Sequence, residues 1–517
     1  MTALAPFVPT SDDLRPFAAE LWLIAGIAAN LLVPFATRRP NFVCAAATLA
    51  AIALAIISLL SAGHGDGGGP HLRGLLWFDS TAYFWKLILL CFVAGVVVLW
   101  IDHSGRTLRQ GDGPEFFVLL LGATLGMCLM ASTTHLLMIF MAIAMASLPS
   151  YLLAGFSKGS KRGAEASLKY VLFGAVTGSI LIYGISFLYG MYGTLQLTQL
   201  TELVARAPVA GQSAVLSLAL IGLLIGIGFK ISAVPLHFWC PDVFEGASIE
   251  VTTFLSVASK GAALVLLLRV VQLMGGTHLG WLVGTVGAIT ATVGNAAAFT
   301  QTNIKRLLAY SSIAQAGYMT CVVAAAGSAN EPATGSIAQA LLIYLVIYAV
   351  MNLGAFAVVA VVIRQSGEQL EDFAGLGRAS PALAGAMLCC LISLIGLPPF
   401  AGFGAKVNVL WVLAQQGVPG MALVAIIVLN TVLSAFYYFR IVRVMYLQPA
   451  TGAPGMNRIW TRHPLGALLG CGCAVGLVLM FFLFGPLYAV TSRSAPEISA
   501  PVAASASSAS VVTSENS

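Results

Sequence analysis

The residues best suited to chemistry in this chain are lysines inside long apolar runs. Lys230 lies in one apolar run and Lys260 in the next, with Pro235 and His237 between them. A charge at the centre of a membrane helix costs about 2.5–3.5 kcal/mol on insertion scales, so a retained lysine indicates a function or a partner. An apolar environment disfavours the charged ammonium, so such a group exchanges a proton when its surroundings change. A proton relay is the natural use of these lysines.

Prolines interrupt two of the apolar runs. Proline lacks a backbone donor and clashes with the preceding turn, so the run around Lys230 should break near Pro235. An overlong run over 381–414 contains Pro398 and Pro399, and Lys406 follows them closely. A break inside a membrane is tolerated only where protein or a water-filled cavity satisfies the freed backbone groups. Each break therefore marks a candidate functional position with a lysine beside it.

Other polar residues near these runs have two interpretations. His237 is a candidate proton shuttle beside the break, or a histidine hydrogen-bonded to irregular backbone. Lys86 and Lys169 lie within two turns of the end of a run, where a long side chain can reach the interface and orient the helix. Three acidic residues flank the start of the run that carries Lys260: Asp242, Glu245 and Glu250. A solvated loop is the simplest interpretation of these acids.

The composition places the chain in a membrane. Of its 517 residues 59% are hydrophobic and only 9% are charged, whereas soluble domains carry roughly 25% charged residues. The net charge of +6 indicates no nucleic-acid partner, because the basic residues are spread over separate loops. The nine cysteines form no CxxC pair, so we expect no zinc or iron–sulfur site. Residues 63–68 match GxGxxG but lie between two apolar runs, so we expect no dinucleotide site.

The apolar runs predict an all-α polytopic membrane protein. A spanning helix needs about 20 mostly apolar residues, and by that measure we expect fourteen spans. They cover 17–37, 41–62, 79–101, 115–131, 134–156, 166–190, 212–236, 247–274, 278–300, 303–327, 335–363, 381–414, 419–446 and 463–489. Span twelve is interpreted as two half-helices. The transmembrane domain should run over 1–490, and the Ser/Ala-rich tail over 491–517 is expected to be disordered.

Lys and Arg residues predict the orientation of the spans. One set of alternate loops carries fifteen of the 25 basic residues: Arg38, Arg39, Arg106, Arg109, Lys158, Lys161, Arg162, Lys305, Arg306, Arg364, Arg378, Arg440, Arg443, Arg458 and Arg462. The other set, with both termini, carries five: Arg15, Arg73, Arg206, Arg269 and Arg493. The five others lie within spans: Lys86, Lys169, Lys230, Lys260 and Lys406. This bias predicts both termini on the outer side, and an even number of spans requires both on one side.

The two broken spans predict an internal inverted repeat. Span twelve comes five spans after span seven, so the two cross the membrane in opposite directions. If residues 115–274 form one five-helix unit and residues 278–446 another, each break falls on the fourth helix of its unit. Interrupted helices at corresponding positions of two inverted halves are a strong sequence indication of a transport path.

Several segments carry a resemblance to a known family. They are FKISAVPLHFWCPDVFEGA with FLSVASKGA, SLKYVLFGAVTGSILIYGISFLYG, QTNIKRLLAYSSIAQAGY and LPPFAGFGAKVNVL. Over residues 75–445 the chain resembles the antiporter-like membrane subunits, most of all the subunit N family of the proton-pumping NADH:quinone oxidoreductase (respiratory complex I). The first segment is specific, and the others are shared more widely among antiporter-like subunits. The resemblance implies fourteen core helices, with discontinuous helices seven and twelve and inverted repeats.

The resemblance also implies roles for individual residues. Lys230 corresponds to the central-helix lysine of the family, Lys260 to its bridging lysine and Lys406 to the lysine of the second half-channel. Lys169 matches another charged position. By the same resemblance the chain translocates protons in the inner membrane of a bacterium, beside other antiporter-like subunits. FMN, iron–sulfur clusters and the sites for NADH and quinone are expected in partner subunits, and no cofactor is expected in this chain.

Two departures from the family pattern bear on mechanism. Ala144 stands where the family has a glutamate that pairs with the lysine matched by Lys230. The acids left near a membrane edge are Glu115 and Glu165. Either one of them reaches Lys230, or the first half-channel is impaired. Gln315 stands where a histidine is common, which could weaken a hydrated path in the second half.

Three functions remain open from the sequence. The first is a proton-translocating subunit of complex I. The second is the membrane subunit of a multisubunit cation/proton antiporter or of a membrane-bound hydrogenase, against which the wording VPLHFWCPDVFEGA argues. The third is a structural subunit that keeps the membrane arm intact without pumping, for which Ala144 is the best support.

Overall fold

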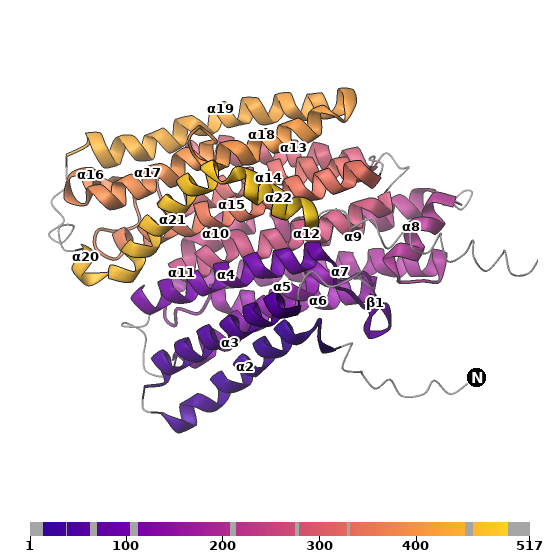
Figure 1. Ribbon diagram of the computed structural model, residues 1–517, viewed down its shortest axis with the longest axis horizontal. Helices are drawn as coiled ribbons and strands as arrows, with labels where there is room; N and C mark the ends of the chain where they lie inside the picture. The colour runs from indigo at the N-terminus through magenta and orange to yellow at the C-terminus, as the bar shows by residue number, and fades with distance from the viewer. Residues whose placement is uncertain are drawn as a thin grey trace, which may run out of the picture.

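The computed structural model describes residues 14–37, 39–62, 70–103, 112–206, 213–274, 279–327, 331–449 and 459–494. In these ranges the chain is a bundle of long helices that run side by side (Figure 1). The first half contains α2 (Ala18–Ala36), α3 (Pro40–Ala62), α4 (Ser80–His103), α5 (Asp112–Ser132), α6 (Leu136–Ala154), α7 (Lys161–Tyr192), α8 (Leu197–Arg206), α9 (Ser213–Ile231), α10 (Trp239–Gly246), α11 (Ile249–Phe254) and α12 (Lys260–Val271). The second half contains α13 (Leu279–Ala298), α14 (Ile304–Ala324), α15 (Glu331–Ile363), α16 (Leu376–Ala379), α17 (Pro381–Ile395), α18 (Ala401–Ala414), α19 (Gly417–Leu447), α20 (Ile459–Arg462), α21 (Pro464–Phe482) and α22 (Phe484–Ser494).

The helices confirm the predicted all-α membrane architecture. Thirteen helical segments among the described residues are long and apolar enough to cross a bilayer. The shorter apolar helices α17 and α18 together cover the predicted span twelve. Each of the fourteen predicted spans therefore has its helix or pair of helices. Apart from helices, strands β1 (Pro70–His71) and β2 (Leu76–Trp77) pair as a small antiparallel hairpin.

Both predicted breaks are present. Helix α9 ends at Ile231, and α10 begins at Trp239 beyond an irregular segment that contains Pro235. Helix α17 ends at Ile395, and α18 begins at Ala401. Span eight is also irregular, because the segment Leu255–Ser259 between α11 and α12 is a π-helix.

The two ends of the bundle differ. The end at the left of Figure 1 holds α16, α20 and the start of α11, and the opposite end holds α8 and β1. Alternating helix directions bring the described members of the fifteen loop Lys and Arg residues to the first of these ends, here called the basic end. Arg38, Arg106, Arg109 and Arg458 lie outside the described residues.

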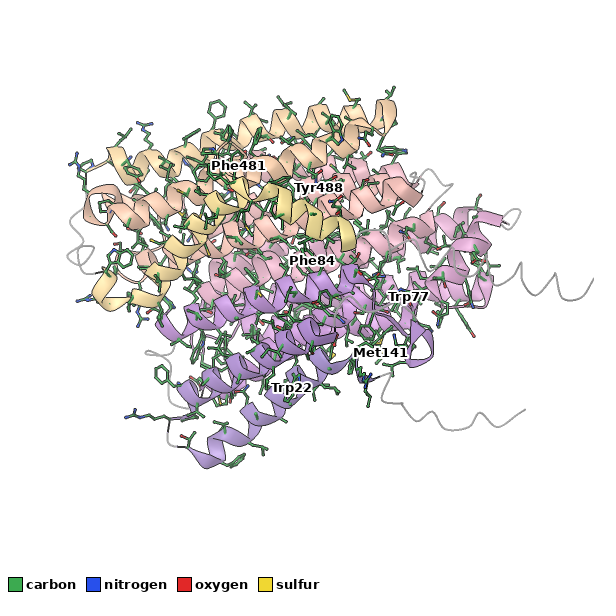
Figure 2. All side chains as sticks on the ribbon, in the orientation of Figure 1. Trp22, Trp77, Phe84, Met141, Phe481 and Tyr488 are labelled. Atoms are coloured by element: carbon green, nitrogen blue, oxygen red, sulfur yellow. The ribbon has the colours of Figure 1, made fainter. Side chains whose placement is uncertain are left out.

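The continuous element from α11 to α12 forms the axis of the bundle. All of its span, Ile249–Val271, is buried within this one chain. Gly261 allows α4 to pack closely against this axis, since a Cβ atom at this glycine would lie 2.0 Å from the Trp85 ring. The outer helices instead expose apolar side chains such as Trp22 and Met141 (Figure 2), as expected for a surface that faces lipid or neighbouring subunits.

The structure extends the predicted C-terminal limit of the membrane domain and leaves two other predicted segments undescribed. Helix α22 continues to Ser494, so helical structure extends past the predicted limit at residue 490. The remainder of the predicted tail and the segment 63–68 lie outside the described residues.

A buried ion pair closes the opposite end of the bundle. Arg269 was assigned to a loop from the sequence, but it lies in α12 with only 4% of its side chain exposed. Its Nη2 atom lies 2.7 Å from each carboxylate oxygen of Asp79, and its Nε donates to the carbonyl oxygen of Ala131 at 3.0 Å. Asp79 Oδ1 also accepts a hydrogen bond from the backbone N–H of Ala82, in the first turn of α4. The pair therefore joins α4, α5 and α12.

We expect Arg269→Ala to destabilise the chain strongly. Asp79 would be left as a buried charge without its arginine, a loss that costs about 3–5 kcal/mol. The melting temperature of the purified protein in mild detergent measures the effect. Lys158→Ala is the matched control, because Lys158 also has acidic partners but its side chain is 64% exposed. Equal melting temperatures for the two variants would contradict the prediction.

Candidate functional site

Lys230 lies in the last turn of α9, just before the first break. Its side chain is 1% exposed, and its Nζ has no hydrogen-bond partner among the described residues. The Nζ atom lies 5.5 Å from the ring centroid of Tyr151 and 5.4 Å from that of Tyr170. Ring faces at this distance attract a cation weakly. Lys230 is thus held by aromatic rings rather than by a carboxylate.

The first break satisfies its own freed backbone groups. The indole Nε1 of Trp239 donates to the carbonyl oxygen of Phe229 at 3.0 Å. The backbone N–H of Val234 donates to Thr290 Oγ1 at 2.9 Å. The Trp239 ring stacks on Tyr170 at 4.2 Å between centroids, so an aromatic cluster fills the gap between the two helix ends. Other side chains therefore satisfy the backbone at this break, and Lys230 Nζ makes no hydrogen bond to it among the described residues.

Lys260 lies at the centre of the axis helix, next to the π-helical segment. It is 0% exposed, and its Nζ donates to Ser312 Oγ at 2.6 Å and contacts Cys240 Sγ at 3.5 Å. Cys240 belongs to α10 and Ser312 to α14. Lys260 therefore connects the interrupted span of the first half with the second helix of the second half.

One face of α14 leads from Lys260 to Lys406. Ser312, Gln315 and Tyr318 follow one another at a spacing of three residues, so they lie along the same side of the helix. Ser312 contacts Lys260, and Lys406 Nζ lies 4.8 Å from the Tyr318 ring centroid. These contacts place the two lysines on one line of polar groups.

Lys406 satisfies a backbone group of the second break. It is 5% exposed, and its Nζ donates to the carbonyl oxygen of Ile395, the last residue of α17, at 2.9 Å. A second contact reaches Thr431 Oγ1 at 3.4 Å. Gly396 adopts a left-handed conformation with φ of +86°, and a Cβ atom there would lie 2.6 Å from the Lys406 side chain. The glycine thus permits both the turn and the approach of the lysine.

Gln315 has a structural role at the same break. Its Nε2 donates to the carbonyl oxygen of Leu394 at 3.0 Å, and its Oε1 accepts from Tyr344 at 2.6 Å. The side chain thereby joins α14 to the end of α17 and to α15. A helix end inside a membrane needs such donors for its last carbonyls.

His237 lies in the first break and is 6% exposed. Its ring centroid lies 4.5 Å from that of Phe238, and its Nδ1 has no hydrogen-bond partner among the described residues. This position is compatible with both interpretations made from the sequence.

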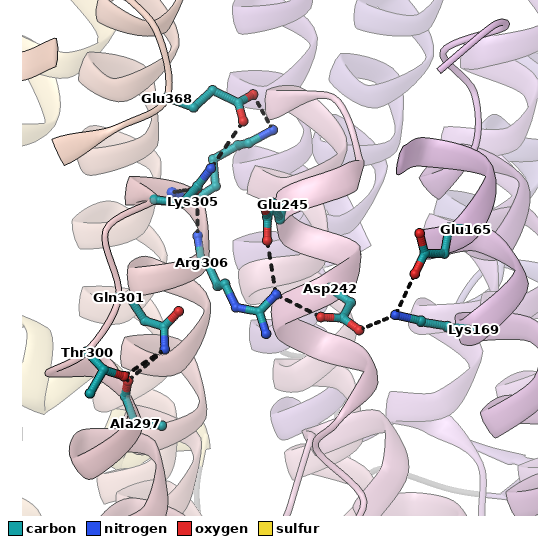
Figure 3. A network of polar contacts seen from close by, with 11 residues as sticks. Glu165, Lys169, Asp242, Glu245, Ala297, Thr300, Gln301, Lys305, Arg306 and Glu368 are labelled. Atoms are coloured by element: carbon teal, nitrogen blue, oxygen red, sulfur yellow. Dashed lines mark hydrogen bonds and ion pairs between the residues drawn. The ribbon is translucent and has the colours of Figure 1, made fainter. Parts of the chain in front are cut away.

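Lys169 belongs to a network at the basic end (Figure 3). Its Nζ lies 2.8 Å from Glu165 and 2.8 Å from Asp242, and Arg306 in turn binds Asp242 at 2.8 Å and Glu245 at 3.0 Å. The Lys169 side chain is 41% exposed, unlike the buried side chains of Lys230, Lys260 and Lys406. The network ties α7, α10 and α14 together and so joins the two halves of the bundle.

Two sequence-based interpretations are wrong in this light. Asp242, Glu245 and Glu250 do not form a solvated loop, because the first two are ion-paired in α10 and Glu250 is 0% exposed in α11. Lys86 does not reach the interface, because it is 1% exposed and pairs with Glu20 at 2.6 Å. Glu20 was missed, although an acid inside the first apolar run was a signal of the same kind as the lysines.

The acids proposed as partners of Lys230 lie elsewhere. Glu115 pairs with Lys158 at 3.2 Å, and Glu165 pairs with Lys169 at 2.8 Å. Hydrogen bonds to Asp112 and Glu115 raise the pKa of Lys158, which lies in the loop between α6 and α7. Among the described residues, no carboxylate replaces the one that Ala144 lacks.

Comparisons with known proteins agree with this geometry. Residues 133–434 match the family described as NADH:quinone oxidoreductase/Mrp antiporter, TM. The chain is 38% identical to NADH-quinone oxidoreductase subunit N 2 of Sorangium cellulosum over 516 residues, covering 93% of this chain and 97% of the relative. A chain in respiratory complex I from Thermus thermophilus has a TM-score of 0.75 and 32% identity, with 92% and 99% of the two chains covered. A chain of the Mrp complex from Dietzia has a TM-score of 0.78 with 95% and 100% covered, but at 19% identity it shares the fold alone.

We expect Trp239→Phe to lower the stability of the first break. The substitution keeps the aromatic stack on Tyr170 but removes the indole donor, so the Phe229 carbonyl oxygen keeps only the backbone N–H of Ser232. The loss of one such hydrogen bond costs about 0.5–1.5 kcal/mol. Thermal unfolding of the purified protein measures this loss. Trp411→Phe serves as the control, because Trp411 is 68% exposed. A Trp239→Phe protein as stable as this control would show that the indole bond contributes nothing.

Proposed function

Because the chain belongs to the subunit N family of NADH-quinone oxidoreductase, we propose that it translocates protons through its buried lysines while other subunits move electrons. The observation that carries this proposal is the position of Lys230, Lys260 and Lys406. All three are at most 5% exposed inside a bundle of membrane helices, and two of them lie at helix breaks. A stability role alone does not account for three such charges, because each is expensive to bury.

The contacts of the lysines support a relay with two unlike halves. In the second half, Lys260 and Lys406 are joined by the polar face of α14. In the first half, Lys230 is enclosed by aromatic rings. His237 lies in the same break and is the candidate proton carrier between the break and the axis helix. Lys169 at the basic end is more exposed and ion-paired, so a positioning role suits it better than proton transfer.

The chain works within a larger assembly. Its relatives are subunits of NADH-quinone oxidoreductase, and it is part of a complex with other membrane subunits. In this proposal NADH, FMN, the iron–sulfur clusters and quinone are handled by partner subunits, and this chain performs no redox step. The complex lies in a bacterial cell membrane. The concentration of Lys and Arg at the basic end supports a cytoplasmic position for that end and an outer position for both termini.

A cation/proton antiporter subunit is the weaker alternative. The Mrp chain has 19% identity to this protein, against 38% for the subunit N relative, so only the fold is shared with the antiporter. A structural subunit without pumping remains the alternative that the experiments below address.

We expect Lys406→Ala to lower proton pumping far more than it lowers the amount of assembled complex. The lysine is the proton carrier of its half, but it also binds the Ile395 carbonyl oxygen. Lys406→Gln separates these two roles, because its amide can still donate that hydrogen bond but cannot take up a proton. Protons pumped per NADH oxidised in membrane vesicles should fall in both variants. A normal ratio in both, at normal levels of complex, would remove Lys406 from the path.

We expect Ala144→Glu to leave pumping equal or higher. Ala144, Ser147 and Tyr151 lie on one face of α6, so a glutamate there approaches the Tyr151 ring that faces Lys230. With no competing carboxylate at Lys230, the new acid can form an ion pair. Ala144→Gln is the uncharged control for size. A lower pumping ratio in Ala144→Glu than in Ala144→Gln would indicate that another acid already serves Lys230.

A further inference from the structure

A further ionisable pair, with one buried member, lies at the basic end, outside the line of lysines. The carboxylate Oε1 of Glu250 is 2.7 Å from Nδ1 of His103. Glu250 lies in the first turn of α11 and His103 is the last residue of α4, and these helices are neighbours in the bundle (Figure 1).

The two side chains of this pair differ in their exposure to solvent. The His103 side chain is 23% exposed, whereas Glu250 is 0% exposed. The carboxylate behind it lies at the start of the axis helix. The pair therefore has one member that can meet water and one that faces the core.

Stability alone does not explain this pair. Buried ion pairs can often be replaced by apolar residues of similar volume without loss of stability. Other contacts already hold the end of α4 in place. Asp102 accepts a hydrogen bond from the backbone N–H of Gly466 at 3.1 Å, which binds α4 to α21, and Arg364 donates to the His103 carbonyl oxygen.

Polar groups lead from Glu250 along the axis helix to Lys260. Thr253 and Ser256 follow Glu250 at steps of three residues, and Lys260 comes one turn after Ser256, so all four share one face. The ten residues from Glu250 to Lys260 span about 15 Å at a rise of 1.5 Å each. The π-helical segment lies within this stretch, and such segments are frequent at functional sites.

A buried hydroxyl on this stretch lies next to Lys260 in the chain. Ser259 is 1% exposed, and its side chain interacts with the Tyr170 hydroxyl. Beside it, Lys260 Nζ donates to Ser312. A water molecule held by such hydroxyls can pass a proton between groups that do not touch directly.

From this geometry we infer that His103 and Glu250 form the proton entry of this chain at the basic end and load Lys260. The inference rests on the proposed function and adds to it the first acceptor of the proton. His103 Nε2 takes a proton from water, and the Nδ1 proton passes to Glu250 Oε1. Glu250 then releases that proton to water and hydroxyl groups along the axis helix. Neutral Lys260 accepts it and becomes an ammonium, so one proton enters and no charge is left behind.

The test replaces the carboxyl group with a group of the same shape. In membrane vesicles of the intact complex, Glu250→Gln should reduce protons pumped per NADH oxidised as much as Lys260→Ala does. Glu250→Asp keeps a carboxyl group and should restore at least half of the lost pumping. Glu371→Gln is the matched control, because Glu371 is an exposed carboxyl at the same end and should leave the ratio unchanged.

Chemical rescue separates proton transfer from a merely structural contact. His103→Ala should lower the pumping ratio, and added imidazole should restore it, because the small base can occupy the exposed edge and carry the proton. This measurement also decides the matter if Glu250→Gln fails to assemble. A structural role predicts that imidazole has no effect on the ratio.

The outcomes distinguish this inference from the proposed function. If Lys260→Ala and Lys406→Ala leave the ratio unchanged, the proposed function fails. If those variants lower the ratio while Glu250→Gln and His103→Ala do not, only the entry site is overturned. An equal loss in Glu250→Gln and Glu250→Asp, without rescue of His103→Ala by imidazole, would also overturn it.

Discussion

Backbone carbonyls freed by two helix breaks within the membrane are the constraint on which this structure depends. Lipid offers no donors, so the protein must supply them. At the first break Trp239 supplies the donor for Phe229, and at the second Lys406 and Gln315 supply donors for Ile395 and Leu394. The freed carbonyl oxygens thus receive hydrogen bonds from an aromatic side chain in the first half, and from a lysine and a glutamine in the second.

Lys406 and Lys230 therefore differ in the hydrogen bonds that their amines make. In the proposed function Lys406 carries a proton and also donates to the Ile395 carbonyl oxygen, so proton transfer and local structure depend on one side chain at the second break. Lys230 makes no such hydrogen bond among the described residues. Because Ala144 replaces the family's glutamate, Lys230 also lacks that carboxylate as an ion-pair partner. Its protonation should respond mainly to water and to the aromatic rings around it.

The axis helix and α14 connect the two halves. Lys260 on the axis helix meets Ser312 on α14, and the face of α14 continues to the second break. At the basic end, Asp242 lies between Lys169 and Arg306, so a single carboxylate ties α7 to α14. The entry pair of His103 and Glu250 lies on the same end as this network, at the start of the axis helix.

The sequence by itself determined the spans, both breaks and the burial of Lys230, Lys260 and Lys406. These features are local: a run of apolar residues is long enough to cross or it is not, and proline breaks its own helix. Only the tertiary structure decided which charges meet. Lys86 pairs with Glu20, His103 with Glu250 across 147 positions, and Arg306 with Asp242 across 64. Such partners come from helices whose packing depends on the whole bundle, and no spacing within one run encodes them.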